Sequence, residues 1–254
     1  MQEPKGRKGQ DIKERSEPEA EDIEELDLKD IEELGELAED KEGEEEEEDE
    51  EKPRKPKPAE HYFTENPRSE KRYGLITAVI NGMQYEFLTC SGVFSPKGID
   101  KGTFILAENM RLKPDGDVLD FGCGYGTIGT VAAGLTSGKV LMSDINKRAI
   151  ELAKKNIKRN RLSNAQARQS NIFEKIPEKF DAILLNPPFT AGMDVVFAML
   201  GQSKEHLNPD GTIQVVARHN KGGARLKARL LELFGNCEET AKEAGYRVYL
   251  STLK

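Results

Sequence analysis

Apolar and polar positions along residues 61–254 follow two different periods, and the changes between them mark the expected elements. Short runs rich in branched and aromatic residues predict seven strands, at 117–121, 139–143, 166–169, 181–185, 212–217, 237–240 and 246–251. Apolar residues at helical spacing predict helices near 103–111, 126–136, 147–160, 192–208 and 222–234. Strands that alternate with helices of this length form a mostly parallel sheet with helices on both faces, so the expected fold class is α/β.

An additional pair of strands is expected before this alternating region. The segments 74–80 and 83–90 are rich in residues that favour strands, and they flank Asn81-Gly82, the strongest two-residue hairpin signal. We therefore predict an N-terminal β-hairpin, followed by a loop over 91–103.

The first 60 residues differ in composition from the rest. They carry 26 acidic and 11 basic side chains, a net charge of −15, whereas residues 61–254 carry 20 acidic and 27 basic side chains, a net charge of +7. With few apolar side chains, residues 1–60 cannot bury enough surface to offset the entropy of ordering. We therefore expect two parts: a largely disordered acidic tail over 1–60 and one folded domain over 61–254.

The role of the acidic tail is left open by its sequence. Apolar positions within 21–41 follow helical spacing, which predicts a short amphipathic helix there. Three interpretations fit: a solvated tail with a transient helix, a helix that docks a basic partner, or an acidic arm that competes with nucleic acid for the basic face of residues 61–254.

Several classes of protein are excluded by what the sequence lacks. No apolar run reaches the length needed to span a bilayer, and the N-terminus has no apolar core of a secretory signal. Cys90, Cys123 and Cys237 are widely spaced with no C-x-x-C pair, which argues against a disulfide framework and a zinc site. We therefore expect a cytoplasmic protein without a metal.

Three motifs fall at predicted strand ends, where α/β sheets bind their ligands. The turn Asp120-Phe121-Gly122-Cys123-Gly124-Tyr125-Gly126 follows the first strand, and its glycines allow the backbone to approach a ligand closely. Asp144 ends the second strand, where a carboxylate can bind both hydroxyls of a ribose. Asn171 and Ile172 follow the third strand, where a side-chain amide can meet the edge of an adenine. These motifs predict a nucleotide-cofactor site.

The fourth strand ends in Asn186-Pro187-Pro188-Phe189, which has its own chemistry. An Asn amide oxygen and the following backbone carbonyl can both accept hydrogen bonds from one NH2 group. Proline donates no N–H and fixes its φ angle, which holds these acceptors rigidly. Phe189 adds a flat face for stacking a planar group. The pattern predicts a clamp for an amino nitrogen, and a Pro-Pro turn that merely ends a strand is the alternative.

The identity of the cofactor depends on how the glycines are read. Residues 124–129 match G-x-G-x-x-G, and Asp144 lies 20 positions after Gly124, as in the dinucleotide fingerprint that binds NAD. The Asp-x-Gly-x-Gly-x-Gly order that begins at Asp120, together with the Asn-Pro-Pro-Phe clamp, instead favours S-adenosylmethionine.

On these residues the chain resembles class I S-adenosylmethionine-dependent methyltransferases over 61–254. More narrowly, residues 61–64, 92–95, 100–103, 170–173 and 186–189 are similar to the small-subunit ribosomal RNA guanine-N2 methyltransferases and their single-domain archaeal relatives. The resemblance implies a Rossmann-like, mostly parallel seven-stranded sheet. Bacterial members carry a second, inactive domain before the catalytic one, and this chain has the acidic tail in that place.

The resemblance also implies roles for individual residues. Asp144 is expected to bind the ribose hydroxyls and Ile145 to pack on the adenine, whose edge Asn171 and Ile172 would meet. The loop before the first sheet strand is expected to close over the methionine carboxylate, with Lys101, Gly102 and Thr103. The methionine and ribose portions would be held by the glycine-rich turn, which comprises Asp120, Gly122, Cys123, Gly124, Tyr125 and Gly126. The clamp Asn186, Pro187, Pro188 and Phe189 is expected to be catalytic.

The expected activity is methyl transfer to an exocyclic amino nitrogen of a nucleobase in RNA, most specifically guanine N2. Because a paired base cannot enter such a pocket, the target must be flipped or unpaired. Two basic groups are expected to bind RNA: one comprises Lys147, Arg148, Lys154, Lys155, Lys158, Arg159 and Arg161, and the other Arg218, Lys221, Arg225, Lys227 and Arg229. Two alternatives stay open, a protein glutamine-N5 methyltransferase and a non-catalytic module that binds the cofactor and assists RNA assembly.

Overall fold

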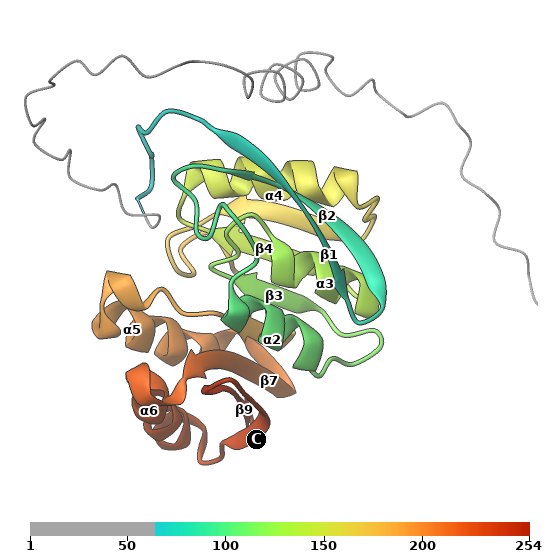
Figure 1. Cartoon of the computed structure of the whole chain (residues 1–254). Coiled ribbons are helices and arrows are strands. Elements are labelled where there is room, and N and C mark those ends of the chain that lie inside the picture. Colours follow the sequence, from blue (N-terminus) through green and yellow to red (C-terminus); the bar gives the residue numbers. More distant parts are fainter. Residues whose placement is uncertain (1–63) are drawn as a thin grey trace, which may run out of the picture. The chain divides into compact units, whose positions relative to one another are not determined.

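The computed structural model describes residues 64–254, which contain the whole predicted α/β region. The expected acidic tail, its helix over 21–41 and the aromatic residues at 61–63 lie outside the described residues. Seven strands form one sheet in the order β5-β4-β3-β6-β7-β9-β8, and helices lie on both of its faces (Figure 1). The strands are β3 (Val118–Phe121), β4 (Val140–Asp144), β5 (Ala165–Gln169), β6 (Phe180–Leu185), β7 (Leu207–Arg218), β8 (Glu238–Glu243) and β9 (Tyr246–Thr252).

The chain reverses its direction of winding around β3. From β3 it proceeds outward through β4 to β5, and it then crosses back so that β6 pairs with the other side of β3. These strands and β7 are parallel, while β9 and β8 close the sheet as antiparallel strands. The carboxyl ends of β3, β4 and β6 therefore meet at the point where α/β sheets bind ligands.

Two separate hydrophobic cores lie on the two faces of the sheet. Leu119, Ile183 and Val215 point to the face covered by α5 (Met193–Ser203) and α6 (Ala224–Phe234). On the opposite face, Val118 and Leu184 pack against α2 (Lys101–Asn109) and α3 (Thr127–Leu135). Because successive strand residues point to opposite faces and both faces are covered, the central strands are apolar almost throughout, as the sequence predicted.

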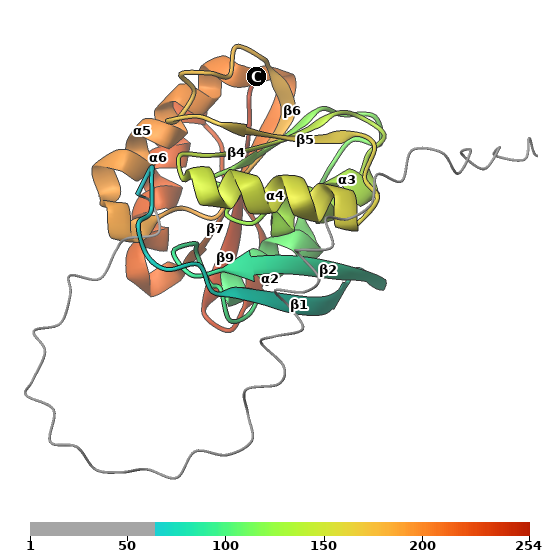
Figure 2. The same ribbon diagram turned by 90° about the horizontal axis from the view of Figure 1, so that it is seen from above.

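The predicted hairpin is formed by β1 (Tyr73–Ile80) and β2 (Met83–Cys90). Asn81 and Gly82 turn with φ values of 52° and 76°, the left-handed pair that a tight two-residue hairpin requires. Seen from above, the hairpin lies beside α4 (Lys147–Arg159) (Figure 2). The hairpin is thus a separate two-stranded layer next to the helix that follows β4.

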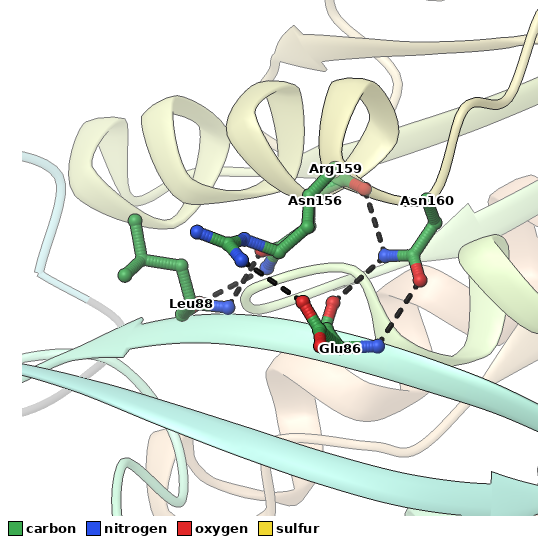
Figure 3. A network of polar contacts seen from close by, with 5 residues as sticks. All are labelled: Glu86, Leu88, Asn156, Arg159 and Asn160. Carbon is green, nitrogen blue, oxygen red and sulfur yellow. Dashed lines mark hydrogen bonds and ion pairs between the residues drawn. The ribbon is translucent and has the colours of Figure 1, made fainter. Parts of the chain in front are cut away.

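An asparagine of α4 and the asparagine that caps its C-terminus, Asn160, bond the open edge of β2. Asn156 accepts the Leu88 N–H at 2.7 Å and donates to the Leu88 carbonyl at 3.0 Å, and Asn160 forms the same pair of bonds with Glu86 at 3.1 and 2.8 Å (Figure 3). Residues four apart on a helix rise by about 6 Å, which nearly matches two residues of a strand. The two amides therefore continue the ladder of β2 and connect the hairpin to the sheet domain.

The two largest differences from the predicted boundaries lie between β6 and β7. The helix predicted over 192–208 ends at Ser203, followed by one 3-10 turn, and β7 begins at Leu207 instead of 212. Pro209 and Gly211 are residues that usually interrupt a strand. Here they only shift the register between β6 and β7, because Leu207 is already buried and paired with Phe180. In the range 64–254, no helix is long and apolar enough to cross a membrane.

Candidate active site

A cavity of about 280 Å³ opens at the carboxyl ends of β3, β4 and β6. All three motifs that the sequence placed at strand ends contribute to its wall. The residues that line it are Val93, Phe94, Thr103, Phe121, Gly122, Cys123, Gly124, Ile128, Ser143, Asp144, Ile145, Ala149, Ser170, Asn171, Ile172, Asn186, Pro187, Pro188, Ala191, Val195 and Met199.

The glycine-rich turn begins directly after β3. Gly122 and Gly124 have φ values of 74° and 57°, a region that residues with a Cβ rarely adopt. A Cβ on Gly124 would meet no atom within 4 Å, so the backbone of the turn lies open to a ligand on that side. Gly126 serves a different purpose: a Cβ there would come within 2.9 Å of the Met142 sulfur, so glycine allows α3 to approach the sheet.

Asp120 is buried beside this turn and stabilises it through a hydrogen bond. It is 1% exposed, and its Oδ2 accepts the Gly129 N–H at 2.7 Å. Burial raises the pKa of Asp120 to about 7, with a smaller contribution from the charge of Asp144, although the Gly129 N–H lowers it. Asp120 does not line the cavity, and its Oδ1 has no hydrogen-bond partner among the described residues.

Asp144 lies in the wall of the cavity at the end of β4. Its Oδ2 accepts the Gly124 N–H at 2.9 Å, and its Oδ1 accepts the Asn146 N–H at 2.8 Å. Burial raises the pKa of Asp144, and these backbone donors lower it. The carboxylate thus links the glycine-rich turn to the start of α4, in the position predicted for a ribose-binding group.

The remaining predicted cofactor residues divide into two sets. Cys123, Ile145, Asn171 and Ile172 line the cavity, and the Asn171 amide donates to Glu174 at 2.7 Å. Tyr125 instead is buried against the hairpin, and its carbonyl accepts a bond from Asn156 at 2.8 Å.

Ser143 is a cavity residue that the sequence reasoning missed. It is 1% exposed, and its hydroxyl has no partner among residues 64–254. It directly precedes Asp144, and a polar residue inside an otherwise apolar strand is the signal that could have identified it.

Asn186 follows β6, and its amide has a determined orientation. The amide nitrogen donates to Asp100 Oδ2 at 3.0 Å and to Thr103 Oγ1 at 2.9 Å. A carboxylate only accepts hydrogen bonds, so the nitrogen, not the oxygen, must face Asp100. Since both amide hydrogens are used, Oδ1 is the acceptor that Asn186 offers to the cavity.

The two prolines after Asn186 also line the cavity. The Pro187 carbonyl, predicted to be the second acceptor of the clamp, already accepts the Phe189 N–H at 2.9 Å. A carbonyl oxygen has two lone pairs, so it can take one further donor. The Pro188 carbonyl accepts the Ala191 N–H at 2.8 Å, which closes the short turn after the clamp.

Six predicted site residues lie outside the cavity wall: Asp120, Tyr125 and Gly126 of the glycine-rich turn, and Lys101, Gly102 and Phe189. Lys101 forms an ion pair with Glu243 and lies over the Phe104 ring, and Gly102 packs against Tyr246; of the predicted loop, only Thr103 reaches the cavity. The Phe189 ring packs against Gly222 and the core under α5 and α6. Phe189 is therefore placed to support the clamp from behind.

The chain is similar to a known protein family and to several known proteins. The family described as "Methyltransferase small domain" matches residues 84–250. An uncharacterized protein of Bacillus subtilis, YbxB, is 33% identical over 75% of this chain and 96% of its own length. Ribosomal RNA small subunit methyltransferase C of Haemophilus influenzae (strain 86-028NP) is 36% identical over 62% of this chain and 48% of its own length. This chain thus spans about half the length of the named methyltransferases that it matches.

Solved structures of methyltransferases also resemble this chain. The T. thermophilus 16S rRNA N2 methyltransferase RsmC, in complex with AdoMet and guanosine, is 28% identical, with a TM-score of 0.65 over 74% of this chain and 52% of its own. A methyltransferase from Pyrococcus furiosus is 23% identical, with a TM-score of 0.55 over 63% of this chain and 86% of its own, and supports the fold alone.

Proposed function

The chain belongs to the methyltransferase small domain family, with S-adenosylmethionine as its cofactor, and from this premise we propose that it methylates the N2 amino group of a guanine in small-subunit ribosomal RNA. The observation that carries the proposal is the orientation of Asn186, whose amide nitrogen is held by Asp100 and Thr103. An amide fixed in this way presents an acceptor to an incoming amino group.

The residues of the cavity fit the cofactor. The open face of the glycine-rich turn suits close approach of the methionine portion, and Asp144 suits the ribose hydroxyls. The buried hydroxyl of Ser143 lacks a partner within the described range, as expected for a polar group that a ligand satisfies. When bound, S-adenosylmethionine supplies a methyl group on a positively charged sulfur, which an amine nitrogen can attack.

The clamp would act on the amino group. Asn186 Oδ1 and the free lone pair of the Pro187 carbonyl would each accept one amine hydrogen, which draws electron density toward the nitrogen. The same two oxygens stabilise the positive charge that develops on this nitrogen as it is methylated. They need not reorganise, because Asn186 is held by two hydrogen bonds and Pro187 and Pro188 have fixed φ angles. The surplus proton leaves the amine for water.

Charge supports RNA over a protein substrate. Residues 61–254 carry a net charge of +7, which attracts a polyanion. The T. thermophilus relative named for 16S rRNA N2 methylation was solved with guanosine, the nucleoside that carries this amino group. Glutamine N5 of a protein presents the same NH2 group to the clamp. An experiment must therefore distinguish an RNA substrate from a protein substrate.

The test is incubation with methyl-labelled S-adenosylmethionine and, in parallel, small-subunit ribosomal RNA, large-subunit ribosomal RNA or total protein. Nucleoside mass spectrometry should find N2-methylguanosine in the small-subunit RNA, and Asn186→Ala should reduce its rate of formation about a hundredfold or more. Label on adenine N6, or on glutamine in the protein fraction with none in RNA, would overturn the proposal.

A further inference from the structure

Three exposed cations occur between the last residue of β7 and the first turn of α6, and this inference about them rests on the proposed function. Arg218 is the last residue of β7, Lys221 lies in the turn that follows, and Arg225 is in the first turn of α6. None of the three forms an ion pair with a carboxylate of residues 64–254. The sequence grouped them with Lys227 and Arg229 as one basic surface.

The structure divides that basic surface. Lys227 pairs with Glu239 at 2.7 Å, and Arg229 pairs with Glu232 at 2.7 Å. These pairs neutralise the cations farther along α6. Arg218, Lys221 and Arg225 therefore make up the part of the group whose positive charge is available to a ligand, and they are the members at the carboxyl end of the sheet.

Arg218 is connected to the clamp through Tyr246. Its guanidinium lies 5.0 Å from the centre of the Tyr246 ring, and Tyr246 packs against Gly102, where an added Cβ would lie 3.1 Å from the ring. The next residue, Thr103, accepts the Asn186 amide hydrogen at 2.9 Å. Arg218 thus contacts an aromatic ring that packs beside the residue preceding Thr103, a hydrogen-bond partner of Asn186.

Lys221 and Arg225 lie near other residues that contact the clamp or belong to a helix of the cavity wall. Gly222 packs on the Phe189 ring, so Lys221 is one residue away from a contact with the clamp. The Arg225 guanidinium lies 5.7 Å from the centre of the Phe197 ring in α5, and the same helix contributes Val195 to the cavity wall. The three cations therefore lie near residues of the clamp and of the cavity wall.

We propose that Arg218, Lys221 and Arg225 bind the phosphates on either side of the target nucleotide, so that the RNA strand crosses the turn between β7 and α6. A guanidinium that lies on an aromatic face is held in place, while its N–H edge stays available for a phosphate. A base that enters the cavity must carry its flanking phosphates across the rim of that cavity. The other basic surface is less suited: Arg148 is buried and donates to backbone carbonyls, and Arg159 pairs with Glu86.

The experiment measures how the affinity for a fluorescent, unpaired RNA oligonucleotide changes with salt. Each phosphate contact contributes about 0.7 to the slope of log affinity against log salt concentration for single strands. Lys221→Ala with Arg225→Ala should therefore lower the slope by about 1.4. The matched control, Lys154→Ala with Lys158→Ala, removes the same charge from exposed positions of α4 and should leave the slope nearly unchanged.

An unchanged slope in the first pair of substitutions, or an equal decrease in both pairs, would contradict the proposal that this surface binds RNA phosphates. Arg218→Gln should lower the slope by about 0.7, and its circular dichroism melting curve shows whether it is folded. Binding to the oligonucleotide does not depend on which atom is methylated. A failure of the proposed function is therefore seen in the labelling experiment, and a failure of this inference is seen in the salt slope.

Discussion

The amide nitrogen of Asn186 lies 3.0 Å from the carboxylate of Asp100, 86 residues earlier in the chain. The same oxygen of Asp100 accepts the Thr103 N–H at 3.1 Å and so caps the start of α2. One side chain thus begins a helix and sets the orientation of the clamp. Asp100 is therefore a positioning residue, which acts on the substrate only through Asn186.

Replacement of Asp100 separates these two roles. Asp100→Ala should lower the free energy of unfolding by about 1 kcal/mol, because α2 loses its cap. Asp100→Ser retains a good capping residue, so its stability should stay within about 0.5 kcal/mol of the original. Both variants should lower kcat about tenfold. Without the Asp100 carboxylate, the Asn186 amide can also turn its nitrogen, instead of its oxygen, toward the cavity. Urea unfolding and steady-state kinetics check this; Asp100→Ser with unchanged kcat would contradict it.

Asn156 in α4 and Asn160 at its C-cap predict a link between the hairpin and the cofactor site. Asn156 is fully buried and bonds Leu88 twice and the Tyr125 carbonyl once. Asn156→Ala should therefore lower the free energy of unfolding by about 2–4 kcal/mol, because buried backbone groups lose their partners. It should also weaken binding of S-adenosylmethionine, since Tyr125 belongs to the glycine-rich turn.

Asn160→Ala provides the matched control for that link. Asn160 bonds Glu86 in the same way, and its other side-chain hydrogen bond within residues 64–254 goes to the Asn156 carbonyl and not to the glycine-rich turn. Asn160→Ala should lower the free energy of unfolding by about 1 kcal/mol and leave the affinity for S-adenosylmethionine unchanged. Calorimetry that finds the same cofactor affinity in both variants would show that the hairpin and the turn are not coupled.

Gly222 should influence catalysis through Phe189. Its φ is +99°, and a Cβ there would lie 2.9 Å from the Phe189 ring, so Gly222→Ala must displace the ring behind the clamp. We expect a loss of about tenfold in kcat, because small displacements of catalytic groups are costly. Gly82→Ala is the control: its φ is +76°, but nothing lies within 4 Å of the added Cβ. Both variants should lose about 1 kcal/mol of stability, and equal kcat values in the two would argue against the supporting role of Phe189.

The raised pKa of Asp120 predicts a pH dependence of stability. Between pH 3.8 and about 7 the unfolded chain releases the proton of this carboxyl while the folded chain keeps it, so the contribution of Asp120 to stability falls as the pH rises and is constant above about 7. The decrease is at most on the order of 4 kcal/mol. In Asp120→Asn this component should be absent, so the difference in unfolding free energy between the two proteins should change across this range. A difference that is independent of pH would contradict the raised pKa.

Local features of the sequence were enough to predict the framework of the site. Asn81-Gly82 determines the hairpin turn. The glycines after Asp120 permit the positive φ angles that the structure has at these positions. The topology of a parallel sheet then brings Asp144 and Asn186 to the same edge. These predictions succeed because each depends on neighbouring residues and on the rule that parallel strands end on one side.

Side-chain partners that are distant in the chain could not be predicted in this way. Lys101 carries a charge suited to a carboxylate ligand, but Glu243 pairs with it across 142 residues. Phe189 has an aromatic face suited to stacking, and its ring also contacts Gly222 and the core under α5 and α6. The hydrogen bond between Asp100 and Asn186 has no signature in either segment alone. The sequence therefore indicates which residues have the right chemistry, and packing decides which of them reach the cavity.

The most direct test of the clamp is a crystal structure with S-adenosylhomocysteine and guanosine. We expect the Asn186 nitrogen to stay on Asp100 and Asn186 Oδ1 to lie within about 3.2 Å of guanine N2. An Asn186 nitrogen that faces the cavity, or a guanine amino group bound away from Asn186 and Pro187, would contradict it.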